Sequence, residues 1–443
     1  MERNINILFV AYQFPPLNVG GSLRPFMFAK YLPYHGINPT VLTLDPKCYS
    51  KIYPNANIDS KPLNDLPKEV AIEFIKSKDL INKQRKFPYN KIPEVFNEGF
   101  FWKKDFFRSS ENLLSKKEYK AILVTAPPFS VLNLARKLSK KHNIPLIVDL
   151  RDHWSLWVTN PYKTYLHFLL TKKMESAILK FANAVIVTSK VTKTDLINLY
   201  PSLSTEKLYY IPNGLDKPIQ TTKIIFTPKE KITIGYVGSF YFDPASRDML
   251  FKEMKEKKGI KKLQFTPRKE DWLYRSPFYF FKTIRELFDK HPDFQKKIEI
   301  VFAGEQKKWF KDMINEFNLG SNVNHLGWLS RDEAAQFQKN CDFLLLTSSK
   351  VINGKDYSIA GKTFEYIEFQ KPVLAFVTNS AQKDILEKTG NSIIFDPDNI
   401  ENSVSKLHRI FNNGVSLSLN KTFIQKHDRK KLTKKLADLI YQI

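Results

Sequence analysis

The chain has 443 residues, of which 42% are hydrophobic, and its 70 lysines and arginines against 45 acidic residues give a formal net charge of +25. This length allows two or three domains with large cores, and the composition is that of a globular protein without low-complexity segments. Because no apolar run reaches about 18 residues, we expect no membrane-spanning helix. The charge fits anionic partners, namely nucleotides, diphosphate lipids, a membrane surface or nucleic acid.

The two cysteines, Cys48 and Cys341, form no motif. They indicate a reducing compartment and free, buried thiols. Residues 1–12 read as a strand rather than a signal peptide, because no basic segment precedes an apolar run with a cleavage site. We therefore expect a cytoplasmic protein.

The first predicted strand, residues 6–12, leads through two prolines into a glycine loop and a helix. Gly20 and Gly21 let the backbone curl, and Ser22 can cap the helix. A strand, a glycine loop and a helix form a corner that suits an anion, although a Gly-Gly pair alone also fits a plain turn. We expect Arg24, in that helix, to face a cleft.

Residues 51–110 alternate prolines, lysines and aromatic rings, ending in a run from Phe100 to Arg108. Rings interleaved with Lys103 and Lys104 suit a membrane interface, and the same residues suit stacking on single-stranded nucleic acid. The alternative is a helix whose rings are core and whose lysines are solvated.

A predicted strand at residues 144–150 ends in Arg151-Asp152-His153-Trp154. Charged groups at the carboxyl end of a parallel strand point into the ligand crevice, so these are candidate site residues. Structural alternatives are an ion pair between Arg151 and Asp149 and a core position for Trp154.

A further strand at residues 185–189 precedes an Asn213-Gly214 turn, and residues 217–231 read as a linker. The next strand, residues 232–240, again runs into glycine at Gly238. The charged stretch 241–272 resembles an insertion, and loops this long are usually functional or disordered.

Predicted strands at residues 298–304, 323–326 and 343–347, with helices between them, imply a second parallel sheet. Asp396 and Asp398 have the spacing of a metal-binding D-x-D pair, but the proline between them and the following Asn399 favour a turn and a helix cap.

Residues 361–376 predict a loop, a helix and a buried strand. The helix begins beside Gly361 and offers unpaired N–H groups, which suit a phosphate. Glu365 lies near its first turn, where a buried carboxylate would need a partner such as a sugar diol. The alternative is a surface helix with a solvated glutamate.

The run Gly361-Lys362-x-Phe364-Glu365-Tyr366 followed by Lys371-Pro372-Val373 resembles the nucleotide-binding signature of GT-B glycosyltransferases of the retaining family-4 type. The Asp149-Leu-Arg-Asp-x-Trp154 run is similar to that of one branch, which lacks the histidine found there in other members. The Ile211-Pro-Asn-Gly-x-Asp216 run and the first glycine loop resemble the same family.

The resemblance implies an α/β fold of two doubly wound, Rossmann-like domains facing each other across a cleft. The first, acceptor-side domain would be residues 1–217, and the second, nucleotide-sugar-binding domain residues 218–420, with the insertion at about 241–272. The basic helix at about 421–443 would pack back on the first domain.

The resemblance also assigns roles. Donor-binding residues would be Gly20, Gly21, Gly238, Ser239, Gly361, Lys362, Thr363 and Glu365. Catalytic residues would be Asp152, Arg275 and Lys362, with Arg151, His153 and Trp154 on the acceptor side. The guanidinium of Arg275 offers paired donors to a phosphate. The family's first glutamate is replaced here by Tyr357, and the adjacent Asp356 is a candidate substitute.

The implied activity is transfer of a sugar from a nucleotide diphosphate sugar to a hydroxyl, with retention, without a metal or other cofactor. The acceptor would be lipid-linked or a polysaccharide of the cell envelope. The protein would dock from the cytoplasm on the anionic inner face of a membrane, and no nucleic acid is expected because no such motif is present. The alternatives are a nucleotide-sugar epimerase of the same fold and a non-catalytic scaffold that binds anionic lipid or glycan.

Overall fold

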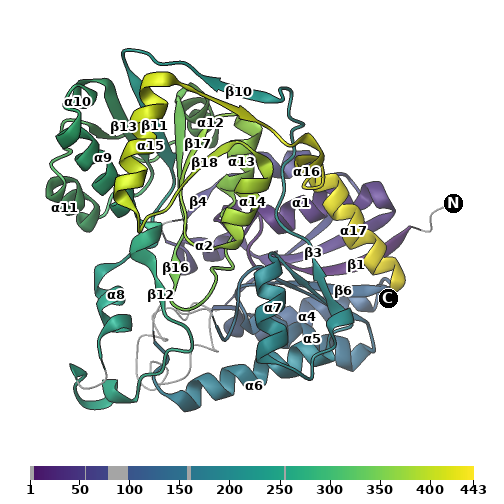
Figure 1. The fold of residues 1–443 in the computed structure, drawn as a ribbon. Coiled ribbons are helices and arrows are strands. Elements are labelled where there is room, and N and C mark those ends of the chain that lie inside the picture. The colour runs from purple at the N-terminus through teal and green to yellow at the C-terminus, as the bar shows by residue number, and fades with distance from the viewer. Residues whose placement is uncertain (1–3, 55, 78–97, 157–160, 254–255) are drawn as a thin grey trace.

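Two parallel sheets, each covered by helices, form the protein (Figure 1). The computed structural model describes residues 4–54, 56–77, 98–156, 161–253 and 256–443. The first sheet has seven strands, all paired in parallel, in the order β5 (Ala71–Ile75), β3 (Ile37–Leu44), β1 (Ile5–Val10), β6 (Ala121–Ala126), β7 (Leu146–Leu150), β8 (Ala184–Val187) and β9 (Leu208–Tyr210).

The second sheet has six parallel strands, in the order β14 (Val323–His325), β13 (Ile298–Ala303), β11 (Ile232–Val237), β15 (Phe343–Thr347), β17 (Val373–Phe376) and β18 (Ser392–Phe395). Strands β15 and β17 are buried along their whole length, and their side chains are apolar except for Thr347, as expected of strands covered on both faces. The predicted fold class, two doubly wound α/β units, is confirmed.

Helices cover both faces of the first sheet. The side chains on the two sides of its strands accordingly fall into two separate hydrophobic clusters, one under each helical layer. One cluster contains α1 (Leu23–Tyr31) and α17 (Arg429–Gln442). The opposite face is covered by α4 (Lys103–Leu114), α5 (Ser130–His142), α6 (Tyr165–Phe181) and α7 (Lys190–Leu199), with the short α2 (Tyr49–Ile52) at its edge.

The second sheet is covered in the same way. One face packs on the apolar sides of α9 (Phe278–Lys290), α10 (Phe294–Lys297), α11 (Lys308–Glu316) and α15 (Ile400–Asn413). The other face packs on α12 (Arg331–Asn340), α13 (Lys362–Phe369) and α14 (Ala381–Thr389). The carboxyl ends of its strands therefore open between two helical layers.

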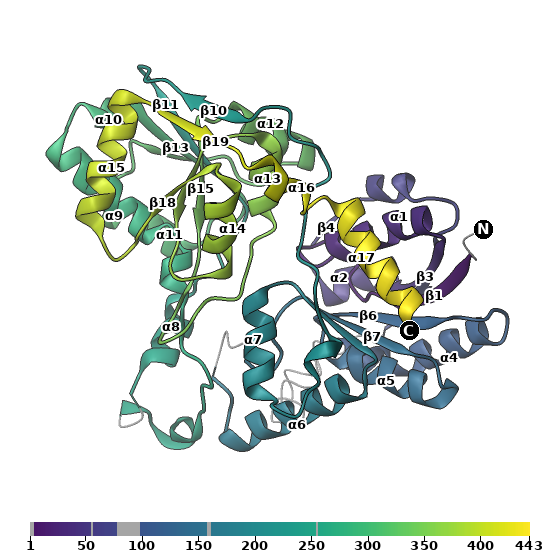
Figure 2. The same ribbon diagram turned by 45° about the vertical axis from the view of Figure 1, so that its right-hand side comes forward.

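The C-terminal segment is two helices rather than the single one predicted at about 421–443 (Figure 2). The first, α16 (Lys421–Gln425), packs through Ile424 on Phe364 of α13. Asp428 then caps α17, accepting a hydrogen bond from the backbone N–H of Lys431 at 3.0 Å. Only α17 joins the core of the first sheet, where it packs against α1.

The predicted linker, residues 217–231, contains a strand of its own. This strand, β10 (Lys223–Phe226), pairs antiparallel with β19 (Val415–Ser418), which follows α15. The segment is thus part of the second unit rather than a free connection.

The stretch 241–272 is structured on both sides of its undescribed residues 254–255. It contains α8 (Pro244–Phe251) and ends in β12 (Glu270–Asp271), which pairs antiparallel with β16 (Lys350–Val351). In between, Phe265 exchanges backbone hydrogen bonds with Tyr162 of the first unit, at 2.8 and 3.0 Å. The insertion therefore connects the two units.

The aromatic run at Phe100–Arg108 is largely core, which is the alternative weighed above. Trp102 and Phe106 are fully buried, and the Trp102 indole donates to the carbonyl of Ile75 at 3.1 Å. Lys103 and Lys104 are exposed. These two rings cannot enter a membrane, while residues 78–97 and the Phe100 side chain lie outside the described part of the chain. No helix among the described residues has the length and apolar character needed to cross a bilayer.

Arg24 was predicted to face a cleft, and this prediction is wrong. Its side chain forms a buried ion pair with Asp149. Its Nε lies 3.1 and 3.0 Å from the two carboxylate oxygens, and its Nη2 lies 2.8 Å from Oδ1. The remaining donors bind the carbonyls of Ile211 and Pro212 at 2.9 and 3.1 Å, and Thr125 donates to the carboxylate at 2.8 Å. Arg151, which the sequence offered as an alternative partner for Asp149, binds other groups.

The buried pair predicts a large effect of Asp149→Asn on stability. The Arg24 guanidinium, with a side chain only 7% exposed, would lose its counter-ion while staying buried. We expect unfolding to become easier by about 3–5 kcal/mol, measured by urea denaturation. The double change Arg24→Met with Asp149→Asn should recover much of that loss, and a single variant as stable as the wild type would contradict the assignment.

Candidate functional site

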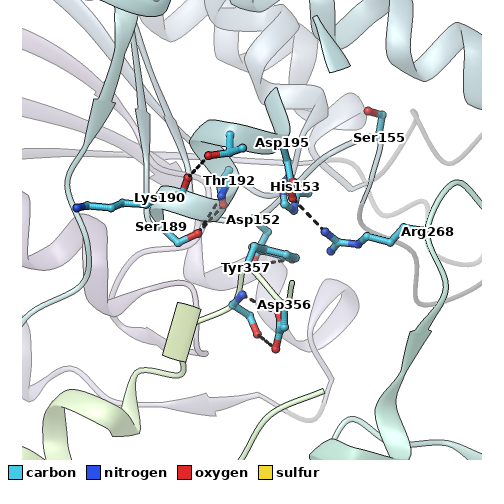
Figure 3. A network of polar contacts seen from close by, with 12 residues as sticks. Asp152, His153, Ser155, Ser189, Lys190, Thr192, Asp195, Arg268, Asp356 and Tyr357 are labelled. Atoms are coloured by element: carbon cyan, nitrogen blue, oxygen red, sulfur yellow. Dashed lines mark hydrogen bonds and ion pairs between the residues drawn. The ribbon is translucent and has the colours of Figure 1, made fainter. Parts of the chain in front are cut away.

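The candidate site lies where the carboxyl edge of the first sheet meets a loop of the second unit (Figure 3). Asp152 and His153 follow β7, and Tyr357 precedes α13. The Tyr357 hydroxyl donates to Asp152 Oδ1 at 3.5 Å, and its ring meets the His153 ring edge-on at 4.0 Å between centroids. The position at which the resemblance expects a carboxylate thus carries a tyrosine that contacts the predicted catalytic residue Asp152 and the predicted acceptor-side residue His153.

Burial dominates the electrostatics of Asp152. It raises the pKa of this carboxyl above its ordinary value, while the nearby guanidinium groups of Arg151 and Arg275 oppose the rise. Arg275 comes from the second unit and Arg151 from the first. Asp152 therefore sits between cations supplied by both units.

His153 is held in a chain of charged groups. Its Nε2 lies 3.2 Å from Asp195 Oδ2 of α7, and Nη1 of Arg268 lies 3.3 Å from the same oxygen. Burial lowers the pKa of His153, although hydrogen bonding to Asp195 opposes this. Arg268 belongs to the insertion, which therefore reaches the site itself (Figure 3).

Arg151 organises the first glycine loop rather than pointing freely into the crevice. Its guanidinium donates to the carbonyls of Gly21 and Pro127 and to Gln13 Oε1, the last at 3.1 Å. A Cβ at Gly21 would collide with Gln13 and Arg151, whereas none of the described atoms lies near one at Gly20. Gly21 is thus needed for close packing, and Gly20 is open.

Trp154 is a core residue, contrary to its predicted acceptor-side role. It is 6% exposed and stacks on Phe129, with ring centroids 5.3 Å apart and planes 3° from parallel. The apolar surface of its ring explains this position, since a buried stack removes it from water.

Its neighbour Ser155 is fixed by the buried Glu175, which accepts from the Ser155 N–H at 3.1 Å.

The second glycine corner brings Gly238 and Lys362 together. Gly238 has φ +124°, and a Cβ there would lie 2.8 Å from Lys362 Nζ. That ammonium lies over the Tyr236 ring, 3.9 Å from its centroid. Gly304, which directly follows β13 and has φ +135°, packs closely on the Gly238 carbonyl. The half-exposed Ser239 follows at the rim of this corner.

Helix α13 starts beside this corner, and it begins next to Gly361, as predicted. Gly361 has ordinary helical angles, φ −55° and ψ −38°, so it is not required for an unusual backbone, and it is exposed. Thr363 is fully buried and donates to Gln382 Oε1 at 3.2 Å, so its side chain does not face the donor position predicted for it. Glu365 is exposed in the first turn of the helix.

Arg275 lies beside a buried carboxylate. Its Nη1 donates to Ser358 Oγ at 3.0 Å, and the Ser358 hydroxyl in turn donates to Asp356 Oδ2 at 3.0 Å. Burial opposes the charge on Arg275, but Asp356 and Glu270 raise its pKa overall. Asp356 also accepts from Ser349 at 2.9 Å, so this carboxylate is engaged by the protein itself.

Sequence reasoning missed Arg268, Glu270 and Asp195. Glu270 lies beside the same serine as Asp356, with its Oε1 2.5 Å from Ser349 Oγ. Burial and Asp356 raise the pKa of Glu270. Arg268 and Glu270 sit in the insertion without a recognisable motif, and the only available signal was the length of that segment. Trp328, which is 72% exposed after β14, was also missed.

The described residues contain no group of three or more histidine, cysteine or acidic side chains that could hold a metal ion. Asp398 accepts from Lys350 Nζ and from the Tyr274 hydroxyl, both at 2.6 Å. Asp396 Oδ1 accepts from the Asp398 N–H at 3.0 Å, and Asn399 caps α15, the turn and cap geometry favoured by the sequence.

Two known families match the chain, one in each of its two units. Residues 26–217 match the family described as Glycosyltransferase Family 4, and residues 278–430 match the family described as Glycosyl transferases group 1. A comparison with curated protein sequences gave no match.

Solved structures share the architecture over nearly the whole chain. Anabaena HepE, solved in complex with UDP and glucose, superposes with a TM-score of 0.58 at 14% identity, over 99% of this chain and 100% of that one. The lipopolysaccharide outer core galactosyltransferase WaaB gives 0.55 at 13% identity, over 99% of both. A putative UDP-N-acetylglucosamine 2-epimerase from Listeria monocytogenes gives 0.53 at 10% identity, over 99% and 96%. At these identities the likeness concerns the fold.

The lowered pKa of His153 predicts a contribution to acid sensitivity. The unfolded histidine takes up a proton as the pH falls through about 6.5, whereas the buried one stays neutral to a lower pH. The unfolded state then binds more protons, so stability falls with pH. Between about pH 7.5 and 5.5, wild type should lose stability more steeply than His153→Asn, by up to about 1.4 kcal/mol per pH unit. Denaturant unfolding at several pH values measures this, and equal slopes would contradict it.

Proposed function

Because the chain belongs to the GT-B glycosyltransferases, we propose that it transfers a sugar from a nucleoside diphosphate sugar to a hydroxyl, with retention at the anomeric carbon. The observation that carries this is the second glycine corner. There, a positive-φ glycine, the Lys362 ammonium and the start of α13 lie together beside the exposed Glu365.

The corner suits a diphosphate for two reasons. Gly238 presents backbone without a side chain. The N-terminal end of α13 also lies at the corner, although the N–H groups of Thr363 and Phe364 already donate to the carbonyls of Ala360 and Gly361, at 3.0 and 3.1 Å. The helix dipole and Lys362 add positive charge where the phosphate oxygens would lie. We place the donor diphosphate against this corner and the ribose against Glu365, whose carboxylate can accept from two neighbouring hydroxyls.

The chemistry that these groups supply is stabilisation of the leaving group. Negative charge grows on the diphosphate as the glycosidic bond breaks, and prepositioned N–H groups and cations stabilise that charge. Lys362 and Arg275 would provide the cations. The anomeric carbon bonds to the acceptor oxygen as the bond to the phosphate oxygen breaks, and the acceptor proton passes to the departing phosphate.

Asp152 would act on the acceptor. Its carboxylate stands at the meeting of the two units, with Tyr357 and His153 beside it, and it can accept a hydrogen bond from the acceptor hydroxyl. This orients the nucleophile toward the donor. We propose a lipid-linked or glycan acceptor, in keeping with the basic charge of +25.

A nucleotide-sugar epimerase of the same fold remains the second candidate, since one such structure superposes on the chain with a TM-score of 0.53. The two activities differ in their products. A transferase releases nucleoside diphosphate when supplied with an acceptor, whereas an epimerase returns an isomeric nucleotide sugar. A panel of nucleoside diphosphates in thermal shift identifies the base first, because a ligand of the folded state raises the melting temperature with its concentration.

Glu365→Gln should weaken donor binding by about 1.5–3 kcal/mol, because the amide keeps the shape but loses the charged acceptor for the ribose hydroxyls. Titration calorimetry with the nucleoside diphosphate selected by thermal shift measures this. Glu401→Gln is the matched control, since Glu401 is likewise exposed in the first turn of a helix. Unchanged binding in a folded Glu365→Gln protein would remove this residue from the site.

Activity should survive EDTA, because the proposed counter-charges of the diphosphate are Lys362, Arg275 and the α13 N-terminus. Release of nucleoside diphosphate is measured with and without the chelator. If activity disappears and returns with Mg²⁺ or Mn²⁺, Asp396 and Asp398 become the residues to test as ligands.

A further inference from the structure

Helix α6 is apolar on the side that it turns to solvent. Tyr165, Leu166, Leu169 and Leu170 are 53%, 63%, 40% and 44% exposed. With 3.6 residues per turn, these positions fall on one continuous stripe that extends to the exposed Lys173. The opposite stripe, with Phe168 and Ile178, is buried in the protein. Among the described residues, most of the outer stripe is therefore open to solvent.

The insertion adds a second exposed element beside this stripe. In the short helical turn Gly259–Leu263, Lys261, Lys262 and Leu263 are exposed, the leucine by 61%. The segment 257–269 carries five lysines and one arginine without a carboxylate, and residues 161–174 carry three lysines without one. Apolar and basic side chains thus alternate on both elements.

The two elements form one surface. Two residues after Leu263, the Phe265 ring packs on Tyr165 and Phe168 of α6, with centroids 4.8 and 4.9 Å apart. The backbone bridge between Phe265 and Tyr162 fixes this contact. In both views α6 and the insertion lie at the same end of the molecule (Figures 1 and 2). We call Tyr165, Leu166, Leu169, Leu170 and Leu263, with Lys173, Lys261 and Lys262, the α6 face.

We propose that the α6 face docks on an anionic lipid bilayer. Exposed leucines and a tyrosine can enter the headgroup region, while the lysines bind lipid phosphates. Because the two segments carry no carboxylate, no negative charge on them repels the anionic lipid. A second protein copy would have to place these lysines against each other or find an acidic patch, so charge complementarity favours the bilayer. This inference rests on the proposed lipid-linked acceptor and identifies the surface that meets its membrane.

The same elements lead from the α6 face to the candidate site. Five residues after Leu263, Arg268 contacts Asp195 and lies over the Tyr357 ring, 5.0 Å from its centroid. On the inner stripe of α6, Glu175 holds Ser155, two residues after His153. A bilayer on the α6 face would therefore hold a lipid-anchored acceptor next to Asp152.

Vesicle co-sedimentation of the full chain tests the proposal. We expect binding to vesicles of phosphatidylcholine mixed with phosphatidylglycerol, weakening from low to physiological salt, and little binding to phosphatidylcholine alone. Leu166→Ser with Leu170→Ser, and separately Lys261→Glu with Lys262→Glu, should each lower the affinity by about tenfold or more.

Two controls match these variants. Ile225→Ser removes an apolar side chain that is 66% exposed on β10, at the opposite end of the molecule (Figure 1). Lys103→Glu with Lys104→Glu reverses two exposed charges on α4. Both should bind vesicles as the wild type does. If the Lys103 and Lys104 variant loses binding and the α6-face variants keep it, the α6 face is the wrong surface.

Three other outcomes would overturn the proposal: no binding to either kind of vesicle, equal binding to both, or a wild-type dimer that the Leu166 and Leu170 changes dissociate. Nucleoside diphosphate binding, measured by thermal shift on the same variants without lipid, should not change. A wild-type protein that binds nucleoside diphosphate but no vesicles would refute the docking face alone, whereas absent nucleotide binding in the wild type would refute the proposed function.

Discussion

The buried pair between Arg24 and Asp149 is the contact on which the first unit and its connection to the second depend. One guanidinium binds a carboxylate at the end of β7 and two carbonyls of the segment that leaves β9. Since both charges are out of water, neither can leave without a large cost. The pair therefore fixes two segments together: the start of the loop that carries Asp152, and the segment after β9 that leads toward the second sheet.

The sequence predicted regular structure well where local signals were strong. Helix α13 begins next to Gly361 and is followed by the strand β17, as predicted for residues 361–376, and the buried strands follow their apolar runs. Predictions about which way a side chain points were weaker. Arg24, Trp154 and Thr363 all lie in predicted loops or helices of the site, yet each is turned into the protein. The periodicity of apolar residues predicts which face of a helix or strand is buried. It does not predict which residue packs against that face, because that residue comes from a distant part of the chain.

The contacts between the units could not be predicted for the same reason. Arg268 and Glu270 reach the site because a strand of two residues, β12, pairs with β16 about 80 positions later in the chain. Such a short pairing leaves no pattern in the sequence. Tyr357 was recognised as a departure from the resembled family, but only the structure places its hydroxyl near Asp152 and its ring against His153.

The chain crosses between the units twice, and the two crossings are bonded to each other. The Leu215 N–H donates to the His427 carbonyl at 3.0 Å, and the Arg429 N–H donates to the Leu215 carbonyl at 3.0 Å. Arg429 also pairs with Asp216 at 2.7 Å. A protease cut between residues 217 and 222 would therefore leave two fragments that stay associated, because α17 remains packed in the first unit while its chain continues from the second. The units are thus tied at two separate places, by this double connection and by the backbone pair between Tyr162 and Phe265.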